Sequence, residues 1–194
     1  MPPIARETLL SLEAYARERP AFRARVLAHK KPRMVELGPH LMLLFEDELT
    51  MRYQIQEMLL TGRTFDEAGI QDELDAYNPL VPDGHNWKAT LQVEYEEPEE
   101  RRQALSQLQG IEDHVWVQVA GQPRVVAIAD EDLERDNAEK TSAVHFVRFE
   151  LSPAMIAALK AGAGLSMGVD HPAYQAMQDP VPEATRTALL ADLA

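Results

Sequence analysis

Cysteine is absent from this chain of 194 residues. The protein therefore forms no disulfide, and it has no thiolate metal site, iron–sulfur cluster or cysteine nucleophile of its own. Long apolar runs are absent too, since none approaches the roughly 18 residues that a membrane-spanning helix needs. Residues 1–7 lack the apolar segment of a secretory signal. We therefore expect a cytoplasmic protein that does not enter a membrane.

Recognisable catalytic motifs are also missing. Neither Gly-x-Ser-x-Gly nor Gly-Lys-Ser/Thr occurs, which argues against a serine hydrolase and a P-loop protein. Gly162, Gly164 and Gly168 follow a predicted helix and precede a predicted strand, the reverse of the order in dinucleotide-binding loops. The six histidines form no His-x-His, His-Glu-x-x-His or Glu-x-x-His pattern. We therefore expect no metal ion and no other cofactor.

Positive charge is scarce overall, and the net charge is −13. Such a chain repels phosphate groups, so nucleic acid is not an expected partner. Residues 1–33 differ, with eight basic and three acidic side chains against 11 and 29 in the remainder. Two interpretations remain open: this segment lies on the protein's own acidic body, or it is a docking surface for an acidic protein partner. Its basic residues concentrate at Arg17, Arg19, Arg23, Arg25, Lys30, Lys31 and Arg33.

Apolar periodicity predicts a mixture of helices and strands. An antiparallel or mixed sheet of about five to six strands, with helices packed on it, is the predicted α+β fold. We predict a basic helical N-terminal arm over residues 1–33 and a single α+β domain over residues 34–194. The predicted helices span residues 4–30, 47–60, 64–77, 98–109, 153–162 and 182–193. The predicted strands span residues 41–45, 87–95, 114–120, 124–129, 142–151 and 165–169.

The predicted helix over residues 47–60 is apolar on two opposite sides. Thr50, Gln54 and Glu57 lie between these sides at i, i+4 and i+7, so they form one polar stripe. A helix that is apolar on two sides packs on two sides, which shields the stripe from water. A shielded Glu57 needs a partner, because burying an unpaired carboxylate costs on the order of several kcal/mol. The residue is then part of a structural network, or it is a general acid/base or ligand.

Two predicted strands supply candidate partners for this stripe. Lys88 and Glu94 share one face of the strand over residues 87–95, which is covered by the helix or meets water. In the strand over residues 142–151, His145 and Arg148 are three residues apart and must point to opposite faces. A lone histidine on an apolar face is more often a satisfied core residue than a catalyst. Arg148 is expected to pair with a carboxylate, either Glu94 or Glu150.

Several short stretches are shared with a known bacterial family. They are Val35-Glu36-Leu37-Gly38-Pro39, Phe45-Glu46, Gln54-Ile55-Gln56-Glu57-Met58-Leu59, Glu73-Leu74, Tyr77-Asn78-Pro79-Leu80, Lys88-Ala89-Thr90, Thr141-Ser142-Ala143-Val144-His145-Phe146 and Asp170-His171-Pro172-x-Tyr174. On these residues the chain resembles the bacterial domain of unknown function family 3501. The resemblance carries over no catalytic residue. It implies an association with peroxide or iron–sulfur redox systems, in which this chain itself holds no cluster.

Two functional hypotheses follow. The first is a non-catalytic accessory or binding protein that acts with a partner, which the missing catalytic motifs and the basic arm favour. The second is an enzyme or small-ligand binder with a shielded polar pocket around Glu57. The oligomeric state is left open. The candidate polar site comprises Thr50, Gln54, Glu57, Lys88, Glu94, His145 and Arg148.

Overall fold

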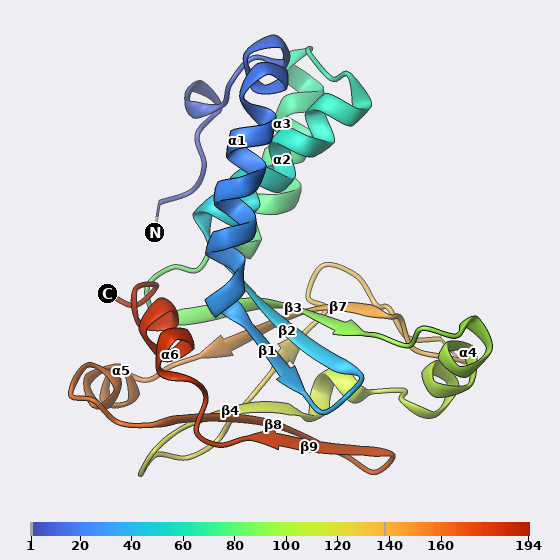
Figure 1. Ribbon diagram of the computed structural model, residues 1–194, viewed down its shortest axis with the longest axis vertical. Helices are drawn as coiled ribbons and strands as arrows, with labels where there is room; N and C mark the ends of the chain where they lie inside the picture. The colour runs from blue at the N-terminus through green and yellow to red at the C-terminus, as the bar shows by residue number, and fades with distance from the viewer. Residues whose placement is uncertain (1, 138) are drawn as a thin grey trace.

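The computed structural model describes residues 2–137 and 139–194 and contains two stacked β-sheets with a helical protrusion above them (Figure 1). The strand order is β1-β2-β3-β7-β6 in one sheet and β5-β4-β8-β9 in the other. All described strand pairs are antiparallel. The predicted α+β class is therefore confirmed, and the strands divide between two sheets, which the sequence did not indicate.

Five of the predicted strands match strands of the structure to within two residues at each end, whereas the strands over residues 34–37 and 174–178 were not predicted. The five-stranded sheet consists of β1 (Met34–Leu37), β2 (Leu41–Glu46), β3 (Asn86–Val93), β7 (Val144–Glu150) and β6 (Ile128–Ala129). The four-stranded sheet consists of β5 (Val125–Val126), β4 (Val115–Val119), β8 (Leu165–His171) and β9 (Tyr174–Gln178). One predicted strand, over residues 124–129, is wrong as a single element. It divides into β5 and β6, which pair with β4 and β7 in different sheets.

The main core lies between the two sheets. Alternation along each strand sends every second side chain inward. Leu43 and Leu91 from one sheet, with Val117 and Met167 from the other, are fully buried in this layer. The inward-facing residues of β3 are thus committed to packing, and its remaining residues point to the outer face, beneath the helices.

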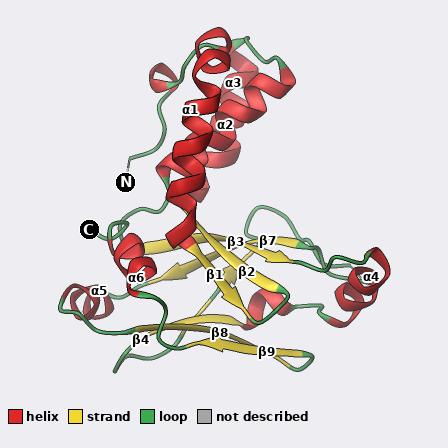
Figure 2. Cartoon of the chain, viewed as in Figure 1, coloured by secondary structure: helices red, strands yellow, loops and turns green. Residues whose placement is uncertain are grey.

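Three helices flank the sheets at their ends. They are α4 (Pro98–Gln107), α5 (Pro153–Lys160) and α6 (Glu183–Leu190). Helices α5 and α6 lie at one end of the sheets and α4 lies at the other (Figure 2). Ser152 caps α5 as predicted, because its hydroxyl accepts a hydrogen bond from the Met155 amide. Gly162 follows α5 with φ 97°, a backbone conformation that favours glycine. The end of the helix therefore explains this glycine without a phosphate-binding loop.

The protrusion consists of α1 (Leu12–Lys30), α2 (Glu48–Gly62) and α3 (Glu67–Tyr77), which rise from the outer face of the five-stranded sheet (Figure 1). They enclose a second, smaller core, which includes Met51, Ile55 and Leu74. The first helix begins at Leu12, not at residue 4 as predicted, because Ser11 caps it there. No helix within the described ranges is both long and apolar enough to cross a membrane.

Candidate functional site

A cleft of about 470 Å³ lies between the protrusion and the outer face of the five-stranded sheet. Its upper wall is the end of α3 with the short helix η3 (Asn78–Leu80), and its floor is β3 and β7. This volume is within the range of small-molecule sites in proteins. The lining residues are Asp75, Ala76, Tyr77, Pro79, Leu80, Lys88, Glu131, Asp132, Phe146, Val147 and Arg148.

Two cations stand side by side on the floor of the cleft. Lys88 of β3 and Arg148 of β7 are direct partners in the antiparallel register. Both side chains point outward because their neighbours Trp87 and Val147 fill the core between the sheets. Like charges opposite each other destabilise a sheet unless other groups neutralise them. The carboxylates around the two residues therefore determine which of the two cations is left to bind a ligand.

Arg148 is fully neutralised by the chain itself. Its guanidinium donates a bidentate pair of hydrogen bonds to Glu131 at 2.9 and 2.8 Å. It also donates a short hydrogen bond to Glu150, one of the two partners predicted for it. These bonds raise the pKa of Arg148 above its ordinary value and lower that of Glu131. Arg148 is a structural cation in this arrangement.

Lys88 is not neutralised in the same way. Its side chain is half-buried and, among the described residues, it takes part in no hydrogen bond and no salt bridge. Glu46, opposite it on β2, instead accepts a hydrogen bond from Thr90 at 2.7 Å. Desolvation, followed by the charge of Arg148, lowers the pKa of the Lys88 ammonium. The carboxylates of Glu131, Asp83 and Glu150 oppose this shift through their charge, but none of them forms a salt bridge with Lys88. A half-buried ammonium without a bonded anion is a binding group for a negatively charged ligand.

The walls around Lys88 are largely apolar. Tyr77 and Leu80 line the helical side, and the ring of Phe146 lines the sheet side. The Arg135 guanidinium lies 4.7 Å from the centre of the Phe146 ring and fixes its position by a cation–π contact. Such walls fit the hydrocarbon or aromatic body of a ligand whose charged end meets Lys88.

The sequence-predicted polar site does not gather in one place. Lys88 and Arg148 meet in the cleft, whereas Glu94 lies beyond the end of β3, where it lines a separate hollow. Thr50 is buried in the capping box of α2 with Asp47, so its hydroxyl serves the helix end. Gln54 is half-buried on the same helix.

Glu57 finds its partners on α1 and not on the sheet. Its carboxylate accepts a hydrogen bond from the Tyr15 hydroxyl at 2.6 Å and two from the Arg19 guanidinium at 2.7 and 2.8 Å. The bonds from Arg19 are the main cause of the lowered pKa of Glu57. These contacts join α1 to α2, so the structural interpretation of Glu57 fits the geometry, and a Glu57–Lys88 pair is not formed.

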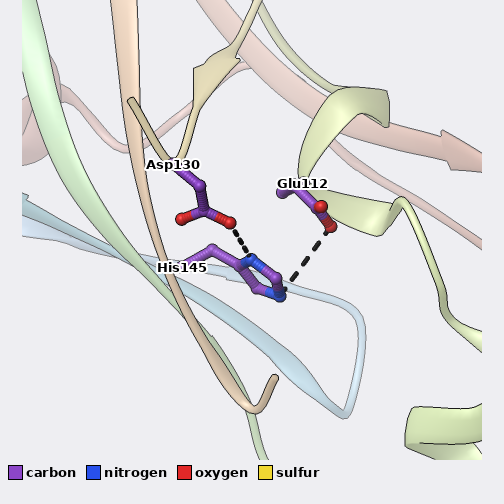
Figure 3. Close-up of side chains that lie close together, drawn as sticks. All are labelled: Glu112, Asp130 and His145. Carbon is purple, nitrogen blue, oxygen red and sulfur yellow. Dashed lines mark hydrogen bonds and ion pairs between the residues drawn. The ribbon is translucent and has the colours of Figure 1, made fainter. Parts of the chain in front are cut away.

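His145 lies on the opposite face of β7 from Arg148, as predicted. Figure 3 shows His145 with its two carboxylate neighbours, Asp130 and Glu112. Its Nδ1 donates to Asp130 Oδ2 at 2.5 Å, and its Nε2 lies 2.8 Å from the Thr141 hydroxyl. Glu112 comes from the short helix η4 (Ile111–His114), and its Oε2 lies 3.7 Å from Nε2. This buried histidine is completely covered, so it cannot act on a molecule in the cleft.

Sequence reasoning missed several residues of these two sites. Glu131 and Asp130 lie in a loop and were not assigned to either site, although they are consecutive. Asp130 accepts a hydrogen bond from His145, and Glu131 accepts one from Arg148. The positive φ of 48° at Asp130 directs its carboxylate inward, where it also accepts a hydrogen bond from the Phe146 amide. Such a backbone turn leaves no periodic pattern in the sequence.

The comparisons with known proteins agree with the family resemblance. A family model described as "Protein of unknown function (DUF3501)" matches residues 3–193. No curated protein matches the chain. A crystal structure of a novel protein of unknown function from Burkholderia pseudomallei K96243 is 59% identical, with a TM-score of 0.94 and 100% of both chains covered. The chain therefore belongs to the DUF3501 family of proteins of unknown function.

Proposed function

We propose that this protein is a non-catalytic binding protein that holds a small organic anion in the cleft beside Lys88. The observation that carries the proposal is the half-buried ammonium of Lys88, which has no salt bridge among the described residues. Charge-assisted hydrogen bonds to such a group are about twice as strong as neutral ones. A bound carboxylate or similar anion supplies the salt bridge that the described part of the chain does not.

The charge of the walls limits the ligand. Asp75, Glu131 and Asp132 lie around the cleft, and their carboxylates repel a molecule with several negative charges. The apolar side chains of Tyr77 and Phe146 favour a body that buries hydrocarbon surface. The proposed ligand class is therefore a monoanion with an apolar or aromatic body.

Binding is favoured over catalysis by the composition of the lining. The residues that line the cleft include no histidine, serine or threonine. Arg148 and Glu131 are bonded to each other, so neither is free as a general acid or base. Lys88 lines the cleft and forms no salt bridge among the described residues, so its ammonium is placed to anchor an anion.

A titration with 2-naphthoate and its neutral analogue 2-naphthamide tests this proposal. We expect the wild type to bind the carboxylate about tenfold more tightly, which corresponds to about 1.4 kcal/mol, and Lys88→Met to lose this preference. Lys140→Met is the matched control, because Lys140 is exposed and lies outside the cleft, and it should keep the preference. Equal binding of the two compounds by the wild type, or a preference that survives Lys88→Met, contradicts the proposal.

The exposed basic residues of α1 and of the short helix η2 (Lys31–Arg33) that follows it support a second function, the docking of an acidic protein partner. Arg19 and Arg33 are bound within the chain, to Glu57 and Asp192. By contrast, the exposed side chains of Arg17, Arg23 and Lys31 form no hydrogen bond or salt bridge within the described ranges. The family resemblance favours a partner from a peroxide or iron–sulfur redox system. Exposed cations without a salt bridge favour association with a negatively charged surface.

A charge-removal experiment tests this second function. We expect the intact protein to capture an acidic protein, with affinity that falls as salt rises, and a triple variant with alanine at residues 17, 23 and 31 to lose it. The same number of alanines at Arg102, Arg124 and Lys160, which lie on the body, is the matched control. Capture of no acidic protein, or equal capture by the triple variant, contradicts this function.

A further inference from the structure

Three chemistry-bearing side chains from different elements meet in the interior on the other face of β7 (Figure 3). Glu112 comes from η4, Asp130 follows β6, and His145 lies within β7. Each offers a ligand atom, and these atoms all lie within 4.8 Å of one another. Among the described residues, no other group of histidine and carboxylate side chains meets this condition.

One atom of this cluster is incompletely satisfied. Glu112 is only 8% exposed, and its Oε2 accepts no hydrogen bond within the part of the chain described. This oxygen points toward His145 Nε2, at 3.7 Å. Buried polar atoms almost always have a hydrogen-bond partner, and each exception calls for an explanation. A group that the chain does not supply, placed between the carboxylate and the imidazole, provides one.

We propose that Glu112 and His145 bind one divalent transition-metal ion, with Asp130 as the residue that orients the imidazole. The separation of 3.7 Å fits two donor atoms that each lie roughly 2.0–2.2 Å from a shared ion. The ion takes the place of a proton on Nε2. An imidazole nitrogen with carboxylate oxygen suits zinc and its neighbours in the first transition series.

The surroundings of the histidine match this assignment. Metal-bound histidines commonly donate their second nitrogen to a carboxylate, and Nδ1 of His145 donates to Asp130 at 2.5 Å. The Thr141 hydroxyl and the Ser142 carbonyl lie 2.8 and 3.1 Å from Nε2, so two further oxygen atoms lie close enough to complete the coordination of the ion. Because His145 is fully covered and Glu112 is only 8% exposed, the ion is structural and ties η4 to β7.

The sequence did not indicate this site, because its residues lie far apart in the chain. Metal motifs are recognised when two ligands share one helix or one turn. Here the three side chains come from a short helix, a loop and a strand, which only the folded chain brings together. The expectation that no metal binds therefore rested on short-range patterns alone.

Zinc binding to the EDTA-stripped protein tests the proposal, with Glu112→Gln as the variant. We expect one Zn²⁺ per chain, a melting temperature that rises on adding Zn²⁺, and at least a tenfold loss of affinity in Glu112→Gln. Glu46→Gln is the matched control, since Glu46 also has a buried oxygen without a hydrogen bond but lies outside the cluster. X-ray absorption of the zinc-loaded protein should show an imidazole nitrogen with oxygen ligands.

Two results would overturn the assignment. One is a stripped wild type that takes up no stoichiometric Zn²⁺ and shows no change in melting temperature. The other is equal zinc affinity in wild type and Glu112→Gln, which places any bound ion on other histidines. If Glu112→Gln does not fold, the zinc stoichiometry and absorption spectrum of the wild type decide the matter. The naphthoate titration is independent, because Lys88 lies on the opposite face of the sheet.

Discussion

Two buried charge networks of this protein differ in how completely their atoms are satisfied. Arg33 is 1% exposed and donates to the carbonyls of Phe45, Ala188 and Glu46 and to the Asp192 carboxylate, at 2.5 to 3.3 Å. The cluster around the fully buried His145 leaves Glu112 Oε2 without a hydrogen-bond donor among the described residues. The saturation of Arg33 is explained by folding alone, whereas an unsatisfied carboxylate oxygen that faces an imidazole leaves a place for a ligand.

The same contrast recurs in the cleft. Arg148 is saturated by Glu131 and Glu150, while its cross-strand neighbour Lys88 forms no salt bridge within the described chain. In both cases the residue that lacks a partner is the one that we assign to a ligand. The contrast therefore predicts opposite outcomes for substitutions: loss of a saturated charge destabilises the fold, and loss of an unsaturated one does not.

The largest effect is expected from Arg33→Leu. Removal of the guanidinium leaves Asp192 buried without its partner, so we expect a loss of about 3–5 kcal/mol in the free energy of unfolding. Urea denaturation followed by circular dichroism measures this loss. The double variant Arg33→Leu/Asp192→Leu should recover part of it, because no unpaired charge then remains. A loss below about 1 kcal/mol in the single variant would show that the network is not structural.

A smaller loss is expected from Glu57→Ala, which breaks the contacts between α2 and α1. Since its partner Arg19 is well exposed, solvent screening reduces the loss in unfolding free energy to about 1 kcal/mol. Glu57→Leu is expected to differ from Glu57→Ala, because the larger side chain still packs between the helices. As a control, Glu67→Ala breaks the exposed pair with Arg6 and should leave the stability unchanged. Equal losses in unfolding free energy for Glu57→Ala and Glu67→Ala would show that Glu57 is no more structural than an exposed ion pair.

The stabilisation by Glu57 depends on pH in a stated direction. Because the folded pKa of this carboxyl is lowered, the stabilisation is fully present above the unfolded value of 4.5. It is lost as the pH falls through the folded pKa, since the unfolded chain binds the proton first. The difference in unfolding free energy between wild type and Glu57→Gln should therefore shrink as the pH is lowered from about 4.5. A difference that grows on acidification would have the wrong sign.

The smallest effect, and one of opposite sign, is expected from Lys88→Met. The folded pKa of Lys88 is lowered, so the charged form destabilises the fold below that pKa, and stability rises with pH up to the unfolded value of 10.5. At pH 7 the variant should be more stable than the wild type, by about 0.5 kcal/mol, and this gain should shrink above the folded pKa. Thermal melts at pH 7 and at alkaline pH measure it. A destabilised variant at pH 7 would show that Lys88 has a structural partner.

Much of the fold follows from local patterns. The alternation in β3 and the capping residues Asp47 and Ser152 were sufficient to place β3, α2 and α5. Strand β9 was missed because none of its side chains is buried, so it has no apolar signal. The division into two sheets was missed because strand pairing depends on the whole chain.

The candidate site was predictable only in part. The opposite directions of His145 and Arg148 follow from the period of a strand, and the structure agrees. The partner of Glu57 was not predictable, because any other helix or strand could pack against the polar stripe of α2. Arg19 meets it from 38 residues away. The neutralisation of Arg148 but not of Lys88 depends on the loop residue Glu131, whose position no pattern fixes.

The pKa of Lys88, measured by NMR on its side-chain signals with and without 2-naphthoate, shows whether Lys88 is a desolvated cation that binds an anion. In the free protein it should lie below the ordinary value of 10.5, because the ammonium is desolvated and has no salt bridge in the described chain. On binding of the anion it should rise, since an opposite charge stabilises the protonated form. A pKa at or above 10.5 in the free protein, unchanged by the anion, would show that Lys88 is not an anion-binding group.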